Sequence, residues 1–201
     1  MMNLYYSPGA CSLAPHISLR EAGLSFELVR VNLGTKQTAD GLDFNAINPK
    51  GYVPALRLED GQVLTEAAVT LQYIADLKPE SKLAPAPGTF ARVRLQEWLQ
   101  YIASELHKGV GPLYSKDASD EYKLVVKNRV SDRLSFVGNS LAGKPFLFGD
   151  GFTIADAYMV YAMRAFKRFA KADIPANLME YQAGLVARPA VKAAFAAEGL
   201  E

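Results

Sequence analysis

The apolar pattern of the chain changes at a charged segment with three prolines, residues 78–87. Before this segment, short apolar runs typical of strands alternate with helical spacing, and after it every pattern is helical. A proline-rich stretch of this kind is typical of a boundary between structural units. The sequence therefore predicts two domains, 1–80 and 88–201, joined by a linker at 79–87.

The first domain is expected to contain a strand–helix–strand unit, then two strands and a helix. Asp60-Gly61 is a strong signal for a tight hairpin between the third and fourth strands. The predicted strands cover residues 3–6, 26–32, 53–58 and 63–64, and the predicted helices cover 12–22 and 66–77. This order predicts an α/β domain of the thioredoxin-like type.

The second domain is expected to be all α. Gly111-Pro112 should end or kink its first helix, because proline lacks a backbone N–H group. Thr153 and Asp156 have the spacing of a capping box, a device that stabilises a helix start. The predicted helices cover residues 89–110, 120–141, 154–169, 177–187 and the stretch after Pro189.

Composition argues against several classes of function. The net charge of +1 and the alternating sign of the polar stretches give no basic face for nucleic acid. No run approaches the roughly 20 apolar residues that span a bilayer. One cysteine and two distant histidines, His16 and His107, lack metal-ligand spacing. Without a disulfide or a leader-like N-terminus, the sequence predicts a cytoplasmic protein that binds no metal, nucleic acid or membrane.

The lone cysteine, Cys11, lies between the Pro8-Gly9 break and the first expected helix. Free N–H groups and the dipole at a helix N-terminus favour an anion, so the pKa of this thiol is expected to fall from about 8.5 toward neutrality. The alternative is a buried small apolar residue, which is the commoner role of a single cysteine.

Two further segments mark the edge of the expected sheet. Pro54 begins a strand and is a candidate for a cis bond that leaves the Val53 backbone free for an extended peptide, although most X-Pro bonds are trans. Glu66 opens a helix, where N–H groups can hold a carboxylate while the side chain binds an ammonium. The alternative is an acid that only complements the helix dipole.

Taken together, these segments resemble the glutathione transferases. Residues 5–12, Tyr-Tyr-Ser-Pro-Gly-Ala-Cys-Ser, are similar to the bacterial beta class, which carries a cysteine at this turn. Further matching segments are 48–56, 64–66, 98–108 and 152–156. The resemblance implies a thioredoxin-like domain of βαβαββα order with a cis bond before Pro54, an all-helical second domain, a homodimer, and glutathione in the cleft between the domains.

The resemblance also implies how glutathione lies. Its cysteine would sit beside Cys11 and its backbone against Val53. Its γ-glutamyl group would be held at Glu66 and Ala67, and Lys36 would approach its glycine carboxylate. The implied glutathione-binding set is Cys11, Lys36, Val53, Pro54, Glu66, Ala67, Gln100, Ser104, Glu105, Leu106 and His107.

One helix of the second domain carries part of that set. Gln100, Ser104, His107 and Gly111 recur at helical spacing, so they form a polar stripe that can face the cleft. The opposite apolar face is Leu95, Leu99, Ile102 and Leu106. By resemblance, Cys11 and His107 are catalytic and Lys108 stabilises the thiolate. Alone, His107 would be a packing residue and Lys108 a solvated charge.

The implied activity is attack of the glutathione thiolate on a small hydrophobic electrophile. Cys11 adds thiol–disulfide exchange and peroxide reduction, with glutathione as the resolving thiol because Ala14 stands where a second cysteine would be needed. Candidate walls of the electrophile pocket are Tyr6, Ala10, Val110, Tyr114 and Phe166, although aromatic residues at helical spacing are more often core. The alternative function is a non-catalytic binding or interaction module on the same fold.

Overall fold

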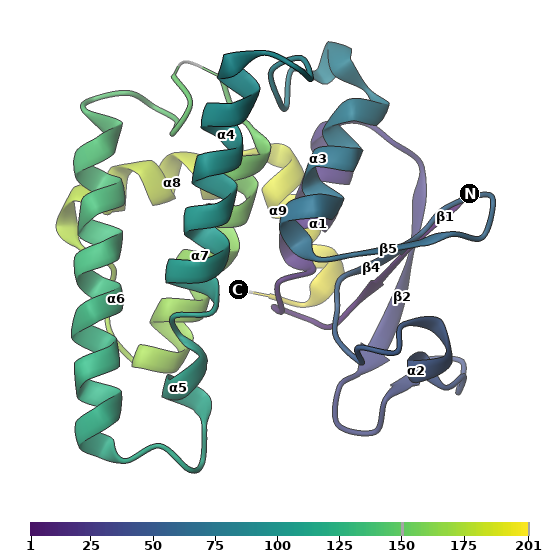
Figure 1. Ribbon diagram of the computed structural model, residues 1–201, viewed down its shortest axis with the longest axis horizontal. Helices are drawn as coiled ribbons and strands as arrows, with labels where there is room; N and C mark the ends of the chain where they lie inside the picture. Colours follow the sequence, from purple (N-terminus) through teal and green to yellow (C-terminus); the bar gives the residue numbers. More distant parts are fainter. Residues whose placement is uncertain (150, 201) are drawn as a thin grey trace.

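A five-stranded sheet and a set of helices lie side by side in the computed structural model, which describes residues 1–149 and 151–200 (Figure 1). The strand order is β3-β2-β1-β4-β5, with β1 parallel to β2 and the other pairs antiparallel. Leu4 in the central strand pairs with Leu28 on one side and Leu56 on the other. The strands are β1 Met2–Tyr6, β2 Phe26–Asn32, β3 Gln37–Thr38, β4 Ala55–Arg57 and β5 Val63–Thr65.

Helices cover both faces of this sheet. α1 (Leu13–Glu21) and α3 (Ala67–Leu77) pack together on the face that carries Leu4. α2 (Phe44–Ile47) covers the other face, where Tyr5 and Phe44 have ring centroids 5.7 Å apart. Residues 13–19 of α1 are all buried, because α1 also packs against α7 (Ile154–Ala170) and α9 (Pro189–Glu198) of the helical part.

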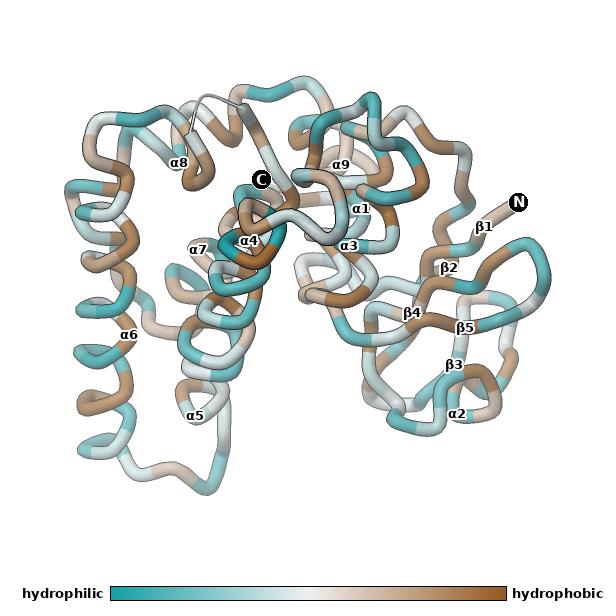
Figure 2. The backbone as a smooth tube through the Cα atoms, turned by 45° about the horizontal axis from the view of Figure 1, so that its top comes forward, coloured by the Kyte–Doolittle hydropathy of each residue, from teal (hydrophilic) through white to brown (hydrophobic). Residues whose placement is uncertain are grey.

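The helical part surrounds α7, most of whose residues are buried (Figure 1). Its other long helix, α6 (Asp120–Leu141), is amphipathic, and Figure 2 shows apolar and hydrophilic residues alternating along it. The remaining helices are α4 Phe90–Tyr101, a π-helix Ile102–His107, α5 Gly111–Tyr114 and α8 Met179–Ala187, with 3-10 turns at Pro79–Ser81 and Ala176–Leu178.

The predicted capping box at the start of α7 is present. Buried Asp156 accepts hydrogen bonds from the Thr153 N–H at 2.8 Å, the Leu147 N–H at 2.9 Å and the Tyr181 hydroxyl at 2.7 Å. The acid therefore joins three segments of the helical part and stabilises more than the helix start.

The fold class is as predicted, with corrections to individual elements. The expected helix 89–110 ends as an α-helix at Tyr101 and continues as a π-helix. The helix stops at His107, shortly before Gly111-Pro112, and this pair begins α5, because a proline in the first turn of a helix needs no N–H partner. The short β3 and α2 lie in a polar stretch where no apolar pattern predicts them. The helix expected from residue 66 begins at Ala67.

The division into domains at 79–87 stays a prediction, and positions 150 and 201 of the second domain lie outside the described residues. Within residues 1–149 and 151–200, no helix has the length and apolar character needed to cross a membrane.

Candidate active site

The turn between β1 and α1 places Cys11 at the edge of the sheet. Gly9 adopts a left-handed conformation, with φ of 68°, and its N–H donates to Glu198 Oε2 at 2.8 Å. The half-buried Cys11 thiol donates to the Val53 carbonyl oxygen at 3.1 Å. The Val53-Pro54 bond is cis, as expected. The turn and the segment before β4 therefore meet at the sulfur atom.

Glu66 lies immediately before α3 and has an unusual backbone conformation, with φ of 70°. Its carboxylate pairs with Lys50, whose Nζ is 2.7 Å from Oε1 and also donates to Thr65 Oγ1 at 3.1 Å. The hydrogen bond from Lys50 lowers the pKa of Glu66. The sequence did not single out Lys50, although it lies in the segment 48–56 that carries the family resemblance.

Two further lysines approach one exposed aromatic ring. Lys36 donates to the Gly51 carbonyl oxygen at 2.8 Å, and its Nζ lies 5.4 Å from the centre of the Tyr52 ring. Lys108, from the helical part, places its Nζ 5.9 Å from the same centre. Tyr52 therefore brings positive charges from both parts of the molecule to one side of the site.

The pKa of Cys11 is not lowered toward neutrality in this structure. Burial raises the pKa of the thiol to about 12, and Glu66 adds to the rise. The backbone N–H groups at the turn and the charge of Lys108 lower it, as the sequence predicted, but they offset only part of the cost of burial. The expectation of a thiolate in the free protein is therefore wrong for this geometry.

His107 contacts two tyrosines of α7. Its Nδ1 lies 2.7 Å from the Tyr158 hydroxyl oxygen, and its ring packs edge-on against Tyr158 and Tyr161. Burial, and then the charge of Lys108, lower the pKa of His107 to about 4. The imidazole is neutral at pH 7, so it brings no positive charge to the Cys11 sulfur, and its catalytic role stays a prediction. No local sequence pattern singled out Tyr158 or Tyr161 as site residues.

Not every residue of the implied glutathione set reaches the Cys11 turn. Val53 and Glu66 of this set interact with Cys11, as does Lys108, the expected thiolate-stabilising residue, and Ala67 is buried at the start of α3. Leu106 is almost fully buried in the helical core, while Gln100 and Ser104 are exposed. Glu105 pairs with Arg133 of α6, which occupies its carboxylate.

The expected electrophile pocket is only partly supported. Val110 and Phe166 are each 1% exposed and belong to the core of the helical part, so they form no open wall. Tyr6 is buried and packs against His16 on the α1 side of the sheet. Ala10 is half-buried, and exposed Tyr114 packs against Phe169 with ring centroids 4.7 Å apart.

The assembled residues can hold a small zwitterionic peptide beside a thiol. They offer a backbone edge at Val53, an ionised carboxylate at Glu66 and ammonium groups at Lys36 and Lys108. Among the residues that the structure describes, no group of three histidines, cysteines or acids is arranged to hold a metal ion.

Comparisons with known proteins point to one family. The model of the glutathione S-transferase N-terminal domain matches residues 9–77, and that of the C-terminal domain matches residues 101–192. Glutathione S-transferase GstA of Escherichia coli O157:H7 is 42% identical over the full length of both chains.

Solved structures agree with these matches. A sphingomonad glutathione S-transferase complexed with glutathione is 43% identical, with a TM-score of 0.91 over 99% of this chain and 100% of that one. The bacterial beta-class enzyme of Sphingomonas chungbukensis is 42% identical, with the same TM-score and the same coverage.

Proposed function

The chain belongs to the glutathione S-transferase family, in its bacterial beta class, and we propose that it joins glutathione to small hydrophobic electrophiles at the Cys11 turn. Glutathione conjugation is the activity for which its curated relatives are named. The observation that supports this location is the 3.1 Å contact between the Cys11 sulfur and the Val53 carbonyl oxygen, beside the Glu66 carboxylate.

Glutathione would bind as an extended strand along Val53. Its γ-glutamyl ammonium would pair with Glu66, which Lys50 keeps ionised, and its γ-glutamyl carboxylate would accept from the free N–H groups at the start of α3, beginning at Ala67. Lys36 would approach the glycine carboxylate, since its ammonium already lies at the Gly51 end of the same edge.

Binding would also change the environment of Cys11. In the free protein the Val53 carbonyl accepts from the thiol, which favours the neutral form. The cysteine N–H of glutathione would compete for that carbonyl. The positive charge of Lys108 would then stabilise a thiolate on Cys11. His107, with Nδ1 accepting from the Tyr158 hydroxyl, would present Nε2–H as a neutral donor.

Conjugation requires little further chemistry from the protein. The glutathione thiol gives its proton to solvent, its sulfur forms a bond to the electrophilic carbon, and the leaving group departs with the bonding electrons. The protein contributes orientation and charge stabilisation. We propose that residues 1–80 hold glutathione and that residues 88–201 contribute the electrophile pocket through Tyr114, with Ala10 of the Cys11 turn on its opposite side.

We propose that the protein is a homodimer. The apolar side chains of Val69 on α3 and of Phe90 and Val93 on α4 are each at least 46% exposed. A second copy would cover these side chains and bring its Gln100 and Ser104 toward the site. Phe90→Glu should then halve the mass measured by light scattering, whereas Leu124→Glu, at a 57% exposed position of α6, should leave it unchanged.

A second activity is thiol–disulfide exchange at Cys11, favoured by the partial exposure of this free thiol. The Cys11 thiolate would attack a disulfide between glutathione and another thiol, forming a mixed disulfide with glutathione and releasing the other thiolate. A second glutathione would then leave as glutathione disulfide and restore the Cys11 thiol. The single free cysteine also fits a cytoplasmic location, where thiols stay reduced.

Conjugation to 1-chloro-2,4-dinitrobenzene tests the site. We expect Glu66→Gln to raise the KM for glutathione at least ten-fold, because a charge-assisted hydrogen bond is lost, while Glu97→Gln, an exposed acid on α4, changes nothing. Cys11→Ala should abolish the mixed disulfide and only partly lower conjugation. An unchanged KM in Glu66→Gln would refute the proposed orientation of glutathione.

A further inference from the structure

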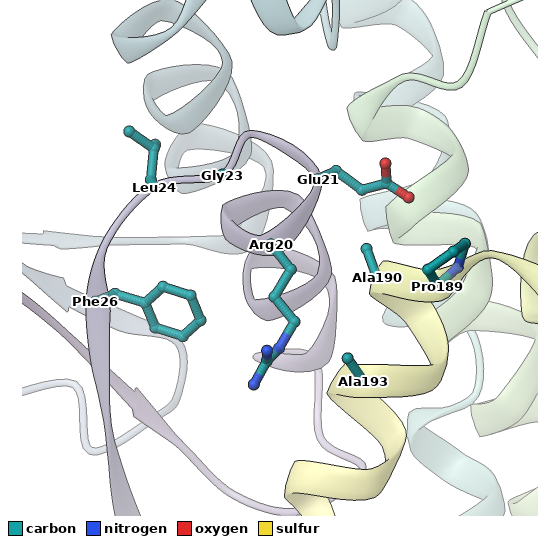
Figure 3. A pocket seen from close by; sticks show the side chains of 8 residues that line it. All are labelled: Arg20, Glu21, Gly23, Leu24, Phe26, Pro189, Ala190 and Ala193. Atoms are coloured by element: carbon teal, nitrogen blue, oxygen red, sulfur yellow. The ribbon is translucent and has the colours of Figure 1, made fainter.

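A second candidate site lies on the molecule between α1, the start of β2 and α9 (Figure 3). The surface pocket there has a volume of about 610 Å³, within the range of small-molecule sites. The residues that line it are Arg20, Glu21, Gly23, Leu24, Phe26, Pro189, Ala190 and Ala193. None of them belongs to the glutathione site proposed above.

The guanidinium of Arg20 is held in place by a hydrogen bond to a buried histidine. Its Nε donates to His16 Nε2 at 2.8 Å, and because arginine Nε is always a donor, His16 must carry its proton on Nδ1. His16 Nδ1 in turn lies 2.8 Å from Glu198 Oε1, and both side chains are fully buried. This chain of hydrogen bonds orients the guanidinium without giving it a direct carboxylate partner.

The other side of Arg20 faces the pocket. Its guanidinium carbon lies 5.7 Å from the centre of the Phe26 ring, and Figure 3 shows the side chain between Phe26 and the alanines of α9. Among the described residues, no acceptor bonds its terminal nitrogens. The two terminal NH2 groups of a preoriented guanidinium therefore remain available to a carboxylate.

The one acid of the pocket is already neutralised. Glu21 receives two hydrogen bonds from Arg188, at 2.6 and 2.8 Å. α9 begins at Pro189, and its helix dipole places partial positive charge there. Arg188 forms no side-chain cap that would offset this charge. The pocket thus combines net positive charge with apolar surface from Leu24, Phe26 and Ala193.

We propose that this pocket binds a flat aromatic carboxylate. The carboxylate pairs with the Arg20 guanidinium, and the aromatic body lies on Phe26 and against Ala190 and Ala193 of α9. The Arg20–His16–Glu198 chain serves as the support that holds the cation in place.

The test uses 2-naphthoate and isothermal titration calorimetry on the full chain saturated with S-methylglutathione, which keeps the active site filled. We expect one molecule bound per chain with a Kd below about 1 mM. Ala193→Glu places a competing carboxylate beside Arg20 and should weaken binding at least ten-fold. Ala183→Glu, the same change at an exposed position of α8, should leave binding unchanged.

The neutral analogue 2-naphthalenemethanol should bind at least ten-fold more weakly than 2-naphthoate, because it cannot pair with the guanidinium. Equal binding of the two compounds, equal binding to both glutamate variants, or no binding of 2-naphthoate at about 1 mM would each overturn the proposal. If the Ala193→Glu protein unfolds at the same temperature as the wild type, its weaker binding does not come from a loss of folded protein.

Discussion

At the scale of single residues, the pKa of the Cys11 thiol is set by opposing effects. Burial and the neighbouring Glu66 carboxylate disfavour the thiolate, and the Val53 carbonyl accepts from the neutral thiol. Lys108 and the backbone N–H groups of the turn favour the thiolate. Burial dominates in the free protein. Under the proposed function, glutathione therefore has to bind before the charges around Cys11 change in favour of the thiolate.

The reactivity of Cys11 should show this balance directly. In the free protein, the rate of alkylation by iodoacetamide should rise about ten-fold per pH unit from pH 7 to 10, with no plateau, because the pKa of the thiol is raised to about 12. Lys108→Met should slow alkylation further, whereas Lys192→Met, on the exposed side of α9, should not. A plateau below pH 8.5 would mean that burial is not the dominant effect.

The neutral state of His107 should make stability depend on pH. The pKa of this imidazole is about 4 in the folded protein and about 6.5 when unfolded, so the unfolded chain binds the proton more readily. Its contribution is therefore fully present above pH 6.5 and is lost as the pH falls toward 4. Urea titrations should show the wild type losing roughly 3 kcal/mol more than His107→Gln over this window. Parallel losses in the two proteins would contradict the neutral assignment.

The residues near the sulfur were predictable to different degrees. Cys11, Glu66 and the Val53-Pro54 segment follow from turn, helix-start and strand-start signals that are local in sequence. The cost of burying Cys11 depends on which side chains of the helical part approach it, and Tyr158 and Tyr161 lie 147 and 150 residues further along the chain. No local sequence pattern predicts that these tyrosines pack near Cys11.

At the scale of elements, the π-helix Ile102–His107 positions the helical side of the site. Its wider turn, seen in the 3.0 Å bond from the Lys108 N–H to the Ala103 carbonyl, departs from the regular spacing on which the predicted polar stripe depends. His107 turns toward Tyr158, while Ser104 bonds back to the Gln100 carbonyl at 3.0 Å and stays exposed. Apolar periodicity predicted the helix here but could not predict the wider turn.

Gly109 is the residue that permits this geometry. A Cβ atom at this position would lie 2.1 Å from the Glu105 carbonyl oxygen, so the backbone would have to move. We expect Gly109→Ala to lower the free energy of unfolding by roughly 1–3 kcal/mol and to lower kcat by displacing His107 and Lys108. The matched control is Gly184→Ala in α8, where a Cβ meets no atom within 4 Å. That change should stabilise the protein by up to about 1 kcal/mol, and equal behaviour of the two variants would refute the role of Gly109.

At the scale of the whole molecule, α1 is shared by the two parts. It packs against α3 beside the sheet and against α7 and α9 of the helical part. Glu21 at its end pairs with Arg188, whose guanidinium carbon lies 4.2 Å from the centre of the Phe152 ring. The change from alternating to helical patterns predicted both parts. It could not predict how they share α1, because the all-round burial of this helix is a property of packing and not of local spacing.

This shared helix should make the two parts unfold together. Ile17 of α1 is fully buried in the core common to both. Ile17→Val removes one methyl group and should cost about 1 kcal/mol, which corresponds to roughly five-fold faster exchange of amides that open only by global unfolding. Hydrogen exchange followed by mass spectrometry should show the same acceleration in β1 and in α7. Val125→Ala, at a 60% exposed position of α6, should accelerate neither. If Ile17→Val accelerated exchange in β1 alone, α1 would belong energetically to the sheet, and the helical part would hold its fold without it.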